Sequence, residues 1–467
     1  DNFNISADFA FSGTATDANG IKIVEGNLDN SGWVSVTGTG TWIYNQSVSN
    51  LSVGPHSLQF RATDKAGNSV TNSYNITYLP ILYVRTSDGV DTNTGIITSP
   101  LKTITKAITL SAQKNVPEIR VALGTYSEVI TISHDVRIKG SYDTNFTVQD
   151  RALYLSTLTH TTYLSNVTIS GSTVSNKMEL NGFRINGSTR AENSLNGLLI
   201  LGGAKPTIKN NYIFGATNTQ AGAAVYSVFI ESGATPLIIG NTIEGGSSLS
   251  REAAIYVIFG GSGVVANNVI ITSAPVEAYG IAVQDTSEII AVNNTLRISG
   301  ASGFSAGIAL DNASNSATVI ANNIIEVVGG GMGIVNKQNA APGIFSNNIL
   351  IAPNRYCLGA SPGSNCSSGT VLDPSTVGGA NAIIAAGATT VVGNLSPGGT
   401  ITSLVVSTSD FHLLAGSLAI DAGRNSSTTA YGTILTDLAG TSRGYNDGAM
   451  ANFDTSAYDI GAYEWTP

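Results

Sequence analysis

Short runs of alternating apolar and polar residues, separated by turn residues, recur along most of the chain. In the first part, runs such as "ADFAFSGTAT", "IKIVEGNL" and "HSLQFRATD" have the period of two that is typical of strands buried on one face. Clusters of Gly, Asn, Asp and Ser separate these runs, as in β-sandwiches. The pattern predicts a β-sandwich over residues 1–79, with a boundary at Leu79-Pro80.

One stretch has helical rather than strand periodicity. In "SPLKTITKAITLSAQ", Leu101, Ile104 and Ile108 recur at the spacing that places them on one helix face. Ser99 is a candidate N-cap, and the proline after it suits the first helical position. We therefore expect a helix near residues 99–113, followed by strands.

The rest of the chain is repetitive. Each unit has two short strands, an asparagine corner and a third apolar strand, as in "GIALDNASNSATVIANNIIEVV". Asn181 lies 30 residues before the first of six corner asparagines, which then follow at intervals of 30, 27, 26, 29 and 25 residues. A single unit cannot bury its apolar face, whereas stacked copies with parallel strands can. The six corner residues are Asn211, Asn241, Asn268, Asn294, Asn323 and Asn348.

Asparagine suits such a corner for two reasons. It tolerates the left-handed backbone conformation that a tight corner needs. Its side-chain amide can also bond to the copy one coil away, which would form a ladder along the stack. We expect Val319 and Ile324, and likewise Ile289 and Leu296, to point into the shared core.

The composition supports an all-β chain and argues against some classes of binding partner. Of 467 residues, 52 are Gly and only 11% are charged, and the 42% apolar content argues against disorder. The net charge of −9 and the lack of a basic stripe along the sequence argue against a nucleic-acid partner. No apolar run reaches the roughly 20 residues of a transmembrane helix. The first residues have no basic and apolar regions of a signal peptide, so we expect none in this chain.

Several segments resemble known families. The string "GPHSLQFRATDKAGNSVTNSYNITY" resembles the last strands of bacterial immunoglobulin-like modules, where Asp64 and Asn68 would serve the hairpin turn. The repeats, the entry segment "LYVRTSDGVDTNTGIITSPLKTITKAI" and the tail "DFHLLAGSLAIDAG" are similar to the right-handed parallel β-helix (pectate-lyase-like) proteins of bacterial surfaces. In that tail, Leu418 replaces the usual proline. The resemblance implies an all-β fold, in which an immunoglobulin-like β-sandwich precedes a right-handed parallel β-helix solenoid with an N-terminal helix cap.

We therefore expect three parts in the chain. They are an immunoglobulin-like module over residues 1–79, the β-helix with its capping helix over 80–375, and the final coils with a C-terminal cap over 376–467. In the cap, an ion pair and turn set is expected to close the last coil. Its members are Asp437, Arg443 and Asp459.

The predicted function is adhesion or glycan binding without catalysis, by a secreted bacterial protein that is extracellular or on the cell surface. Polysaccharides or glycans of a host or cell surface are the candidate partners, and homo-assembly is a further candidate. One alternative is a subunit of a self-assembling extracellular fibre or surface layer, which would donate the strand-like segment 1–11 to a neighbour.

The pectate-lyase-like resemblance also raises an enzyme alternative, a polysaccharide lyase or glycosidase acting on the β-helix face. Its candidate acids are Glu231, Asp285 and Asp311, which follow the first strands of their coils. The same residues are also explained as solvated turn residues. The measured coils contain no histidine, which excludes a histidine-based mechanism on that face.

Two tyrosines are candidates for glycan binding. Tyr226 in "AAVYSVF" and Tyr256 in "AAIYVIF" occupy equivalent positions one coil apart. If both point outward, their rings could form a platform for sugars. The alternative is a stack that only supports the sheet.

Two loops carry further candidates. Asp88, Asp91 and Asn93 in "DGVDTNTG" present oxygen atoms that could bind Ca²⁺, or they form turns that lead into the helix. No other cofactor is expected. Cys357 and Cys366 could form a disulfide in an oxidising compartment, or remain two surface thiols.

Overall fold

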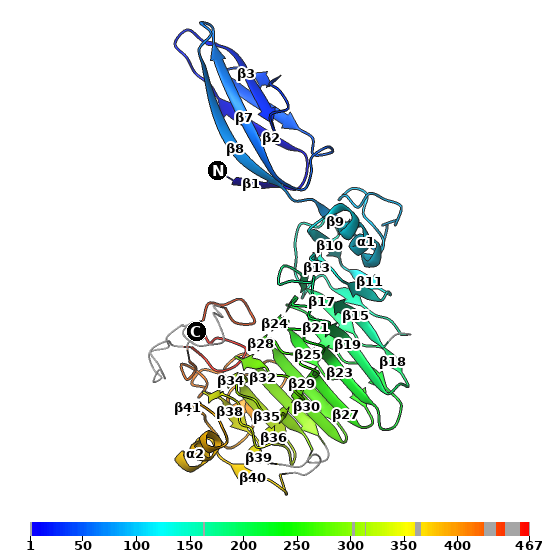
Figure 1. Ribbon diagram of the computed structural model, residues 1–467, viewed down its shortest axis with the longest axis vertical. Helices are drawn as coiled ribbons and strands as arrows, with labels where there is room; N and C mark the ends of the chain where they lie inside the picture. The colour runs from blue at the N-terminus through cyan, green and yellow to red at the C-terminus, as the bar shows by residue number, and fades with distance from the viewer. Residues whose placement is uncertain are drawn as a thin grey trace.

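The computed structural model has a β-sandwich at its N-terminal end and a long parallel β-helix after it (Figure 1). The structure describes residues 2–161, 164–300, 304–312, 314–359, 366–424, 436–443 and 458–466. The predicted all-β class, with a parallel β-helix solenoid behind a β-sandwich, is confirmed. Within the described residues, no helix is both long and apolar enough to span a membrane.

The N-terminal sandwich has two sheets that pack through an aromatic core around Tyr44, Leu58 and Phe60. At the turn between its two longest strands, the Asp64 carboxylate accepts hydrogen bonds from the backbone and side-chain amides of Asn68, both at 2.8 Å. One sheet has the order β1 (Asn2–Ile5), β8 (Ser69–Tyr78), β7 (Gly54–Asp64), β3 (Ile21–Leu28), β4 (Val34–Ser35), and the other β2 (Phe9–Thr14), β6 (Thr41–Gln46), β5 (Thr37–Gly38). Strands β1 and β2 thus pair within their own module.

Helix α1 (Ile104–Lys114) lies at the start of the β-helix and contacts its first strands. It begins five residues later than the sequence predicts. The hydroxyl of Thr103, not Ser99, is the cap and accepts a hydrogen bond from the Lys106 amide at 3.2 Å. The helix buries Ile104, Ala107 and Ile108 against the first coils.

Three long sheets, named I, II and III below, form the sides of the β-helix, and their strands pair in parallel except for β39 and β40. Within one coil, the chain passes through a strand of sheet III, then one of sheet I, then one of sheet II. Sheet I contains β9 (Ile81–Val84), β10 (Glu118–Ala122), β13 (Arg137–Tyr142), β16 (Glu179–Asn181), β20 (Thr207–Lys209), β24 (Leu237–Ile239), β28 (Val264–Ala266), β31 (Ile290–Val292), β34 (Val319–Ala321), β37 (Ile344–Ser346) and β41 (Thr390–Val392).

Sheets II and III complete each coil. Sheet II contains β11 (Gly124–Tyr126), β14 (Ser156–Leu158), β17 (Phe183–Asn186), β21 (Tyr212–Phe214), β25 (Thr242–Glu244), β29 (Val269–Ala274), β32 (Thr295–Gly300), β35 (Ile324–Val328) and β38 (Ile349–Ile351). Sheet III contains β12 (Ile130–Ile132), β15 (Ser165–Ser170), β19 (Ser194–Leu201), β23 (Ala224–Ile230), β27 (Arg251–Val257), β30 (Glu277–Gln284), β33 (Ala306–Asp311), β36 (Met332–Asn336), β39 (Asn354–Leu358) and β40 (Thr370–Leu372). The small elements are β18 (Thr189–Arg190), β22 (Thr217–Asn218), β26 (Ser247–Ser248), α2 (Val377–Ala385) and the 3₁₀ turn Ile401–Ser403.

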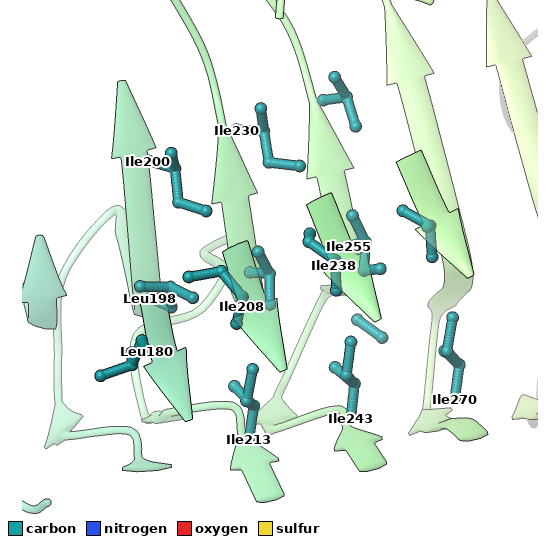
Figure 2. Close-up of a cluster of buried hydrophobic side chains, with 14 of the residues drawn as sticks. Leu180, Leu198, Ile200, Ile208, Ile213, Ile230, Ile238, Ile243, Ile255 and Ile270 are labelled. Carbon is teal, nitrogen blue, oxygen red and sulfur yellow. The ribbon is translucent and has the colours of Figure 1, made fainter. Parts of the chain in front are cut away.

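The interior is a stack of aliphatic side chains from all three sheets (Figure 2). In the three-residue strands of the middle coils the central residue points inward, as Ile208, Ile238 and Ile243 do. Two of the expected core residues are on the other face. Val319 and Ile324 point outward, and their neighbours Ile320 and Ile325 are the ones in the shared core, whereas Ile289 and Leu296 do lie in it.

The second asparagine of each corner forms a continuous buried ladder between sheets I and II. At one rung, the Asn294 side-chain oxygen accepts from the backbone and side-chain amides of Asn268, both at 3.0 Å. The Asn294 side-chain amide then donates to Asn323 at 3.0 Å and to the Val265 carbonyl at 2.9 Å. The ladder runs from Asn211 to Asn394, one rung beyond the six counted in the sequence.

The first corner residue has the left-handed conformation, which explains why Asn alternates with Gly there. Its φ is 56° at Asn322 and 66° at Gly240. The ladder does not include Asn181, which pairs with Lys209 and lies two residues out of register with Asn211. The equivalent of Asn211 in that coil is Phe183, whose amide donates to Asn211 at 2.9 Å.

The C-terminal segment folds back along the flank of the β-helix, over the outer face of sheet II (Figure 1). Its apolar residues, such as Ile420 and Ile460, pack on Ile324 and Ile349. Outward-facing first asparagines hold its backbone: Asn322 both accepts from the Arg424 amide (2.9 Å) and donates to its carbonyl (2.8 Å). The segment therefore covers a side of the stack.

Candidate functional site

A groove of about 470 Å³ lies between the corners of the early coils and the C-terminal segment 436–440. Its lining is rich in amide, hydroxyl and cationic side chains, and Asp437 is the only carboxylate among the lining residues. The lining residues are Ser141, Gln149, Arg151, Asn181, Gly182, Lys209, Asn210, Ile239, Gly240, Asn267, Thr436, Asp437, Leu438, Ala439 and Gly440. A site of this size can hold a small ligand or part of a longer chain.

The floor of the groove is made by the corners themselves. Gly182, Asn210, Gly240 and Asn267 are the first corner residues of four successive coils, all with positive φ. This conformation turns their side chains, where present, away from the interior. Asn267 uses its side chain to hold the C-terminal wall, since its amide donates to the Thr436 carbonyl and its oxygen accepts from Arg443 (2.8 Å).

The two cations of the groove and two of its four side-chain amides are held by contacts within the chain. Arg151 donates to the Gly240 carbonyl at 3.3 Å, and its guanidinium lies 4.9 Å from the centre of the Tyr212 ring. The Lys209 ammonium lies 3.1 Å from the Glu179 carboxylate. The Asn210 amide donates to the Asn181 oxygen at 3.4 Å. These contacts orient the groups and leave further donors and acceptors for a ligand.

Arg443 and Asp459, which the sequence predicted to close the last coil, lie in the C-terminal segment beside the groove. Arg443 is buried and donates to the Gly461 carbonyl (2.8 Å), while its guanidinium lies 3.3 Å from the Glu464 carboxylate. Burial raises the pKa of the Asp459 carboxyl, whose oxygens accept from backbone amides. Because Arg443 also bonds to Asn267, this set holds the tail against the side of a middle coil, whereas the sequence analysis expected these residues on the last coil.

The two candidate tyrosines are not equivalent in register, which corrects the sequence alignment. Tyr226 pairs with Ala253, and Tyr256 pairs with Phe229. Their rings nevertheless stack, with centres 4.4 Å apart and planes 14° apart, on the outer face of sheet III. Only 7% of Tyr226 and 6% of Tyr256 is exposed. The ring faces are therefore occupied by each other and by Phe229, 5.1 Å from Tyr226.

The strand registers do not bring all three candidate acids together at one place. The strand registers place Glu231 and Asp311 three coils apart on the same row of sheet III, which corresponds to roughly 14 Å. Asp285 lies in an exposed turn with φ 59°, directly after Gln284, the register partner of Asp311, so that Asp285 and Asp311 are one coil apart. Asp311 accepts from Gln338 at 3.0 Å and lies 3.6 Å from the Lys337 ammonium.

The candidate calcium residues each have a partner within the chain. Arg85 donates to Asp88 at 2.8 Å, and hydrogen bonds from Arg85 hold the pKa of the Asp88 carboxyl below its ordinary value. Asp91 accepts from the Lys102 and Thr103 amides, and Asn93 donates to the Pro100 carbonyl at 2.8 Å. In the part of the chain that the structure describes, no three His, Cys, Asp or Glu residues are grouped to hold a metal ion.

The two cysteines form a disulfide. Cys357 lies in β39, and Cys366 follows residues 360–365, which lie outside the described residues. The bond holds Cys366 beside the outer face of sheet III.

The sequence analysis named Asn181 and Asp437 but did not identify the groove itself. Its Lys209 ends the triplet "TIK", and two cations outside the groove, Arg120 and Lys139, end "EIR" and "RIK"; in each triplet an inward aliphatic residue has polar residues on both sides. This alternation indicates that the cations point outward. Only the strand register shows that they lie in one row. Arg151 and the wall 436–440 gave no such signal, because their position depends on loops and on the folded-back tail.

One comparison with known proteins concerns a defined part of the β-helix. Residues 87–272 match a family model described as "Protein of unknown function (DUF1565)". No curated protein matches the sequence. Among solved structures, the chain is similar to the native and selenomethionine forms of a GH136 lacto-N-biosidase from Eubacterium ramulus, at 10% identity, with TM-scores of 0.18 and 0.16. Each alignment covers 59% of this chain and 66% of the enzyme, and at these TM-scores it carries no argument about function.

Proposed function

We propose that this chain is a non-catalytic glycan-binding protein of the bacterial cell surface or extracellular space, and that the groove beside the C-terminal segment is its binding site. The observation that supports the proposal most is the lining of the groove, where amides, hydroxyls and two cations converge on an open space of about 470 Å³. Sugar hydroxyls are both donors and acceptors, and such side chains can bond to them from several directions.

The arrangement of acids favours binding over catalysis. Glycosidases need two carboxyl groups roughly 5–9.5 Å apart across the scissile bond. In the groove, the lining carboxylate of Asp437 already accepts from the backbone amides of Thr441 (2.7 Å) and Glu464 (2.9 Å). On sheet III, Glu231 and Asp311 are about 14 Å apart by strand register. Asp285 is one coil from Asp311, but it lies in an exposed turn and the Asp311 carboxylate is paired with Lys337, 3.6 Å away.

Two features support an extracellular setting. A disulfide between Cys357 and Cys366 persists in oxidising compartments and is rare in the cytosol. The N-terminal sandwich, which resembles immunoglobulin-like spacer modules, would hold the β-helix away from a surface. Adhesion through a bound glycan is the role that these features support.

The test is direct binding of the full chain to a glycan array, followed by calorimetry on the best glycan. Arg151→Ala combined with Lys209→Ala is expected to weaken binding by about tenfold or more, since each removes a charged hydrogen-bond donor. Lys177→Ala, an exposed cation outside the groove lining, is the matched control and leaves the affinity unchanged.

The proposal fails if no glycan binds, or if the double variant binds as the unchanged chain does. Release of shorter or unsaturated sugars from a bound polysaccharide would contradict the non-catalytic part and favour the enzyme alternative.

A further inference from the structure

A row of basic side chains crosses the outer face of sheet I in the first coils of the β-helix. Strand register places Arg120 beside Lys139, Lys139 beside Asn181, and Asn181 beside Lys209. Neighbouring strands lie about 4.8 Å apart, so the row from Arg120 to Lys209 spans roughly 14 Å. Arg137 lies on the adjacent row, directly between Glu118 and Glu179.

The carboxylates of this face lie beneath its cations. The side chains of Glu118 and Glu179 are 7% and 15% exposed, against 29% for Arg120 and 35% for Lys209. Glu118 lies 2.8 Å from Arg120, 2.9 Å from Lys139 and 3.3 Å from Arg137. Burial raises the pKa of Glu118, but hydrogen bonds from Arg120 and Lys139 outweigh it and hold the pKa below its ordinary value.

The face therefore presents excess positive charge. Among the described residues, its four cations, Arg120, Arg137, Lys139 and Lys209, meet only two carboxylates, although the whole chain has a net charge of −9. The buried Nε atom of Arg137 has no hydrogen-bond partner among the described residues. Each lysine ammonium has three hydrogen-bond donors. Lys139 uses one of them toward Glu118, and Lys209 uses one toward Glu179.

The basic row leads directly into the groove. Lys209 and Asn181 belong to both, and Arg151 adds a further cation on the groove side. A chain that occupies the groove can therefore continue over Lys139 and Arg120 without leaving the surface of the first coils.

We infer that the glycan bound by this protein is anionic, a uronate-containing or otherwise acidic polysaccharide that lies in the groove and along the basic row from Lys209 to Arg120. The inference rests on the proposed function and adds the ligand's charge and its path. Acidic groups spaced along a sugar chain would each meet a cation, while the sugar hydroxyls bond to the amides of the groove.

The experiment measures binding of the full chain to a short oligogalacturonate and to its neutral methyl ester. The acidic oligomer is expected to bind more tightly, and its affinity to fall about tenfold between low and moderately high salt, as screening of several charge pairs requires. The variant Glu118→Gln/Arg120→Gln/Lys139→Gln removes two cations together with the acid beneath them, which avoids an unpaired buried charge. It should bind the acidic oligomer about tenfold more weakly and the ester as before. Lys65→Ala, an exposed cation of the sandwich, is the control.

The outcomes separate the two proposals. If the ester binds as tightly as the acid, or if the triple variant keeps full affinity for the acid, the anionic path is wrong and glycan binding stands. If neither sugar binds and no array glycan does, the proposed function itself fails. Tighter binding of duplex DNA than of the acidic oligomer would also overturn the inference. A Glu118→Gln variant that folds and binds normally shows that losses in the triple variant come from the cations.

Discussion

The outer face of sheet I changes character halfway along the stack, while its inner face does not. In β10, β13, β16 and β20 the outward positions are mostly charged or amide residues, as in Glu118 and Lys139. From β24 to β37 the same positions are mostly aliphatic, as in Val264 and Ile290. The inward residue is aliphatic throughout, from Ile138 to Ile320. The interior is therefore set by stacking, and the exterior is free to differ between coils.

The largest expected loss of stability comes from cavities in the interior, and it shows whether both halves of the β-helix are packed alike. Ile138→Ala in the charged half and Ile320→Ala in the apolar half should each lower the free energy of unfolding by about 2–5 kcal/mol, because each leaves a cavity in a fully buried layer. Chemical denaturation measures both. A loss in one half only would show that the two interiors are not packed alike.

The next effect separates the two residues of a corner. Asn294→Leu should cost about 3 kcal/mol, because it leaves the Asn268 backbone amide without a partner and removes one hydrogen bond each from the Asn268 side-chain amide and the Val265 carbonyl. Asn293→Gly should cost less than about 1 kcal/mol, because φ is 55° there and the side-chain amide has no partner within the described residues. Equal losses would contradict the assignment of the ladder to the second residue.

A buried carboxyl breaks the uniformity of the interior. Glu252 is fully buried, one oxygen accepts from the Ser273 amide at 3.2 Å, and the other has no partner in the described part of the chain. Burial raises its pKa to about 8. The folded state therefore binds this proton more tightly, and the stability it confers below about pH 4.5 is lost as the pH rises toward 8.

The free energy of unfolding should therefore fall by an amount on the order of 2 kcal/mol between pH 5 and 8. Each unit by which the pKa is raised can contribute at most about 1.4 kcal/mol, so this loss lies within the limit. Denaturation midpoints across that range measure it. Glu252→Gln should be the more stable chain at pH 8 and should flatten the slope. An unchanged slope in this variant would assign the pH dependence to another group.

The smallest expected effect concerns the charged exterior. Lys139→Gln should change the free energy of unfolding by only about 0.5 kcal/mol, since the lysine is partly exposed and Glu118 keeps Arg120 and Arg137. Thermal denaturation of this variant beside Lys65→Ala checks it. A loss as large as that of Ile138→Ala would mean that the basic row is a structural element, and its role in binding would have to be argued again.

The local pattern of the sequence was enough for the class of fold. Alternating strands, a repeat of 25 to 30 residues and an asparagine at each corner require stacked parallel coils, because only stacking buries the apolar side and pairs the corner amides. The predicted ladder from Asn211 to Asn348 follows from the same reasoning.

Only the tertiary structure showed which residues of each strand point inward where both faces are apolar. Val319 and Ile324 are as apolar as their inward neighbours Ile320 and Ile325, because the folded-back C-terminal segment and the apolar outer face of sheet I also bury outward positions. Period two distinguishes the faces of a strand only when one of them meets water. The basic row likewise needs the register, since Arg120, Lys139 and Lys209 are separated by 19 and 70 residues in sequence and share a row only across the coils. Sequence determined that coils stack, and the path of the chain between coils determined which side chains meet on the outside.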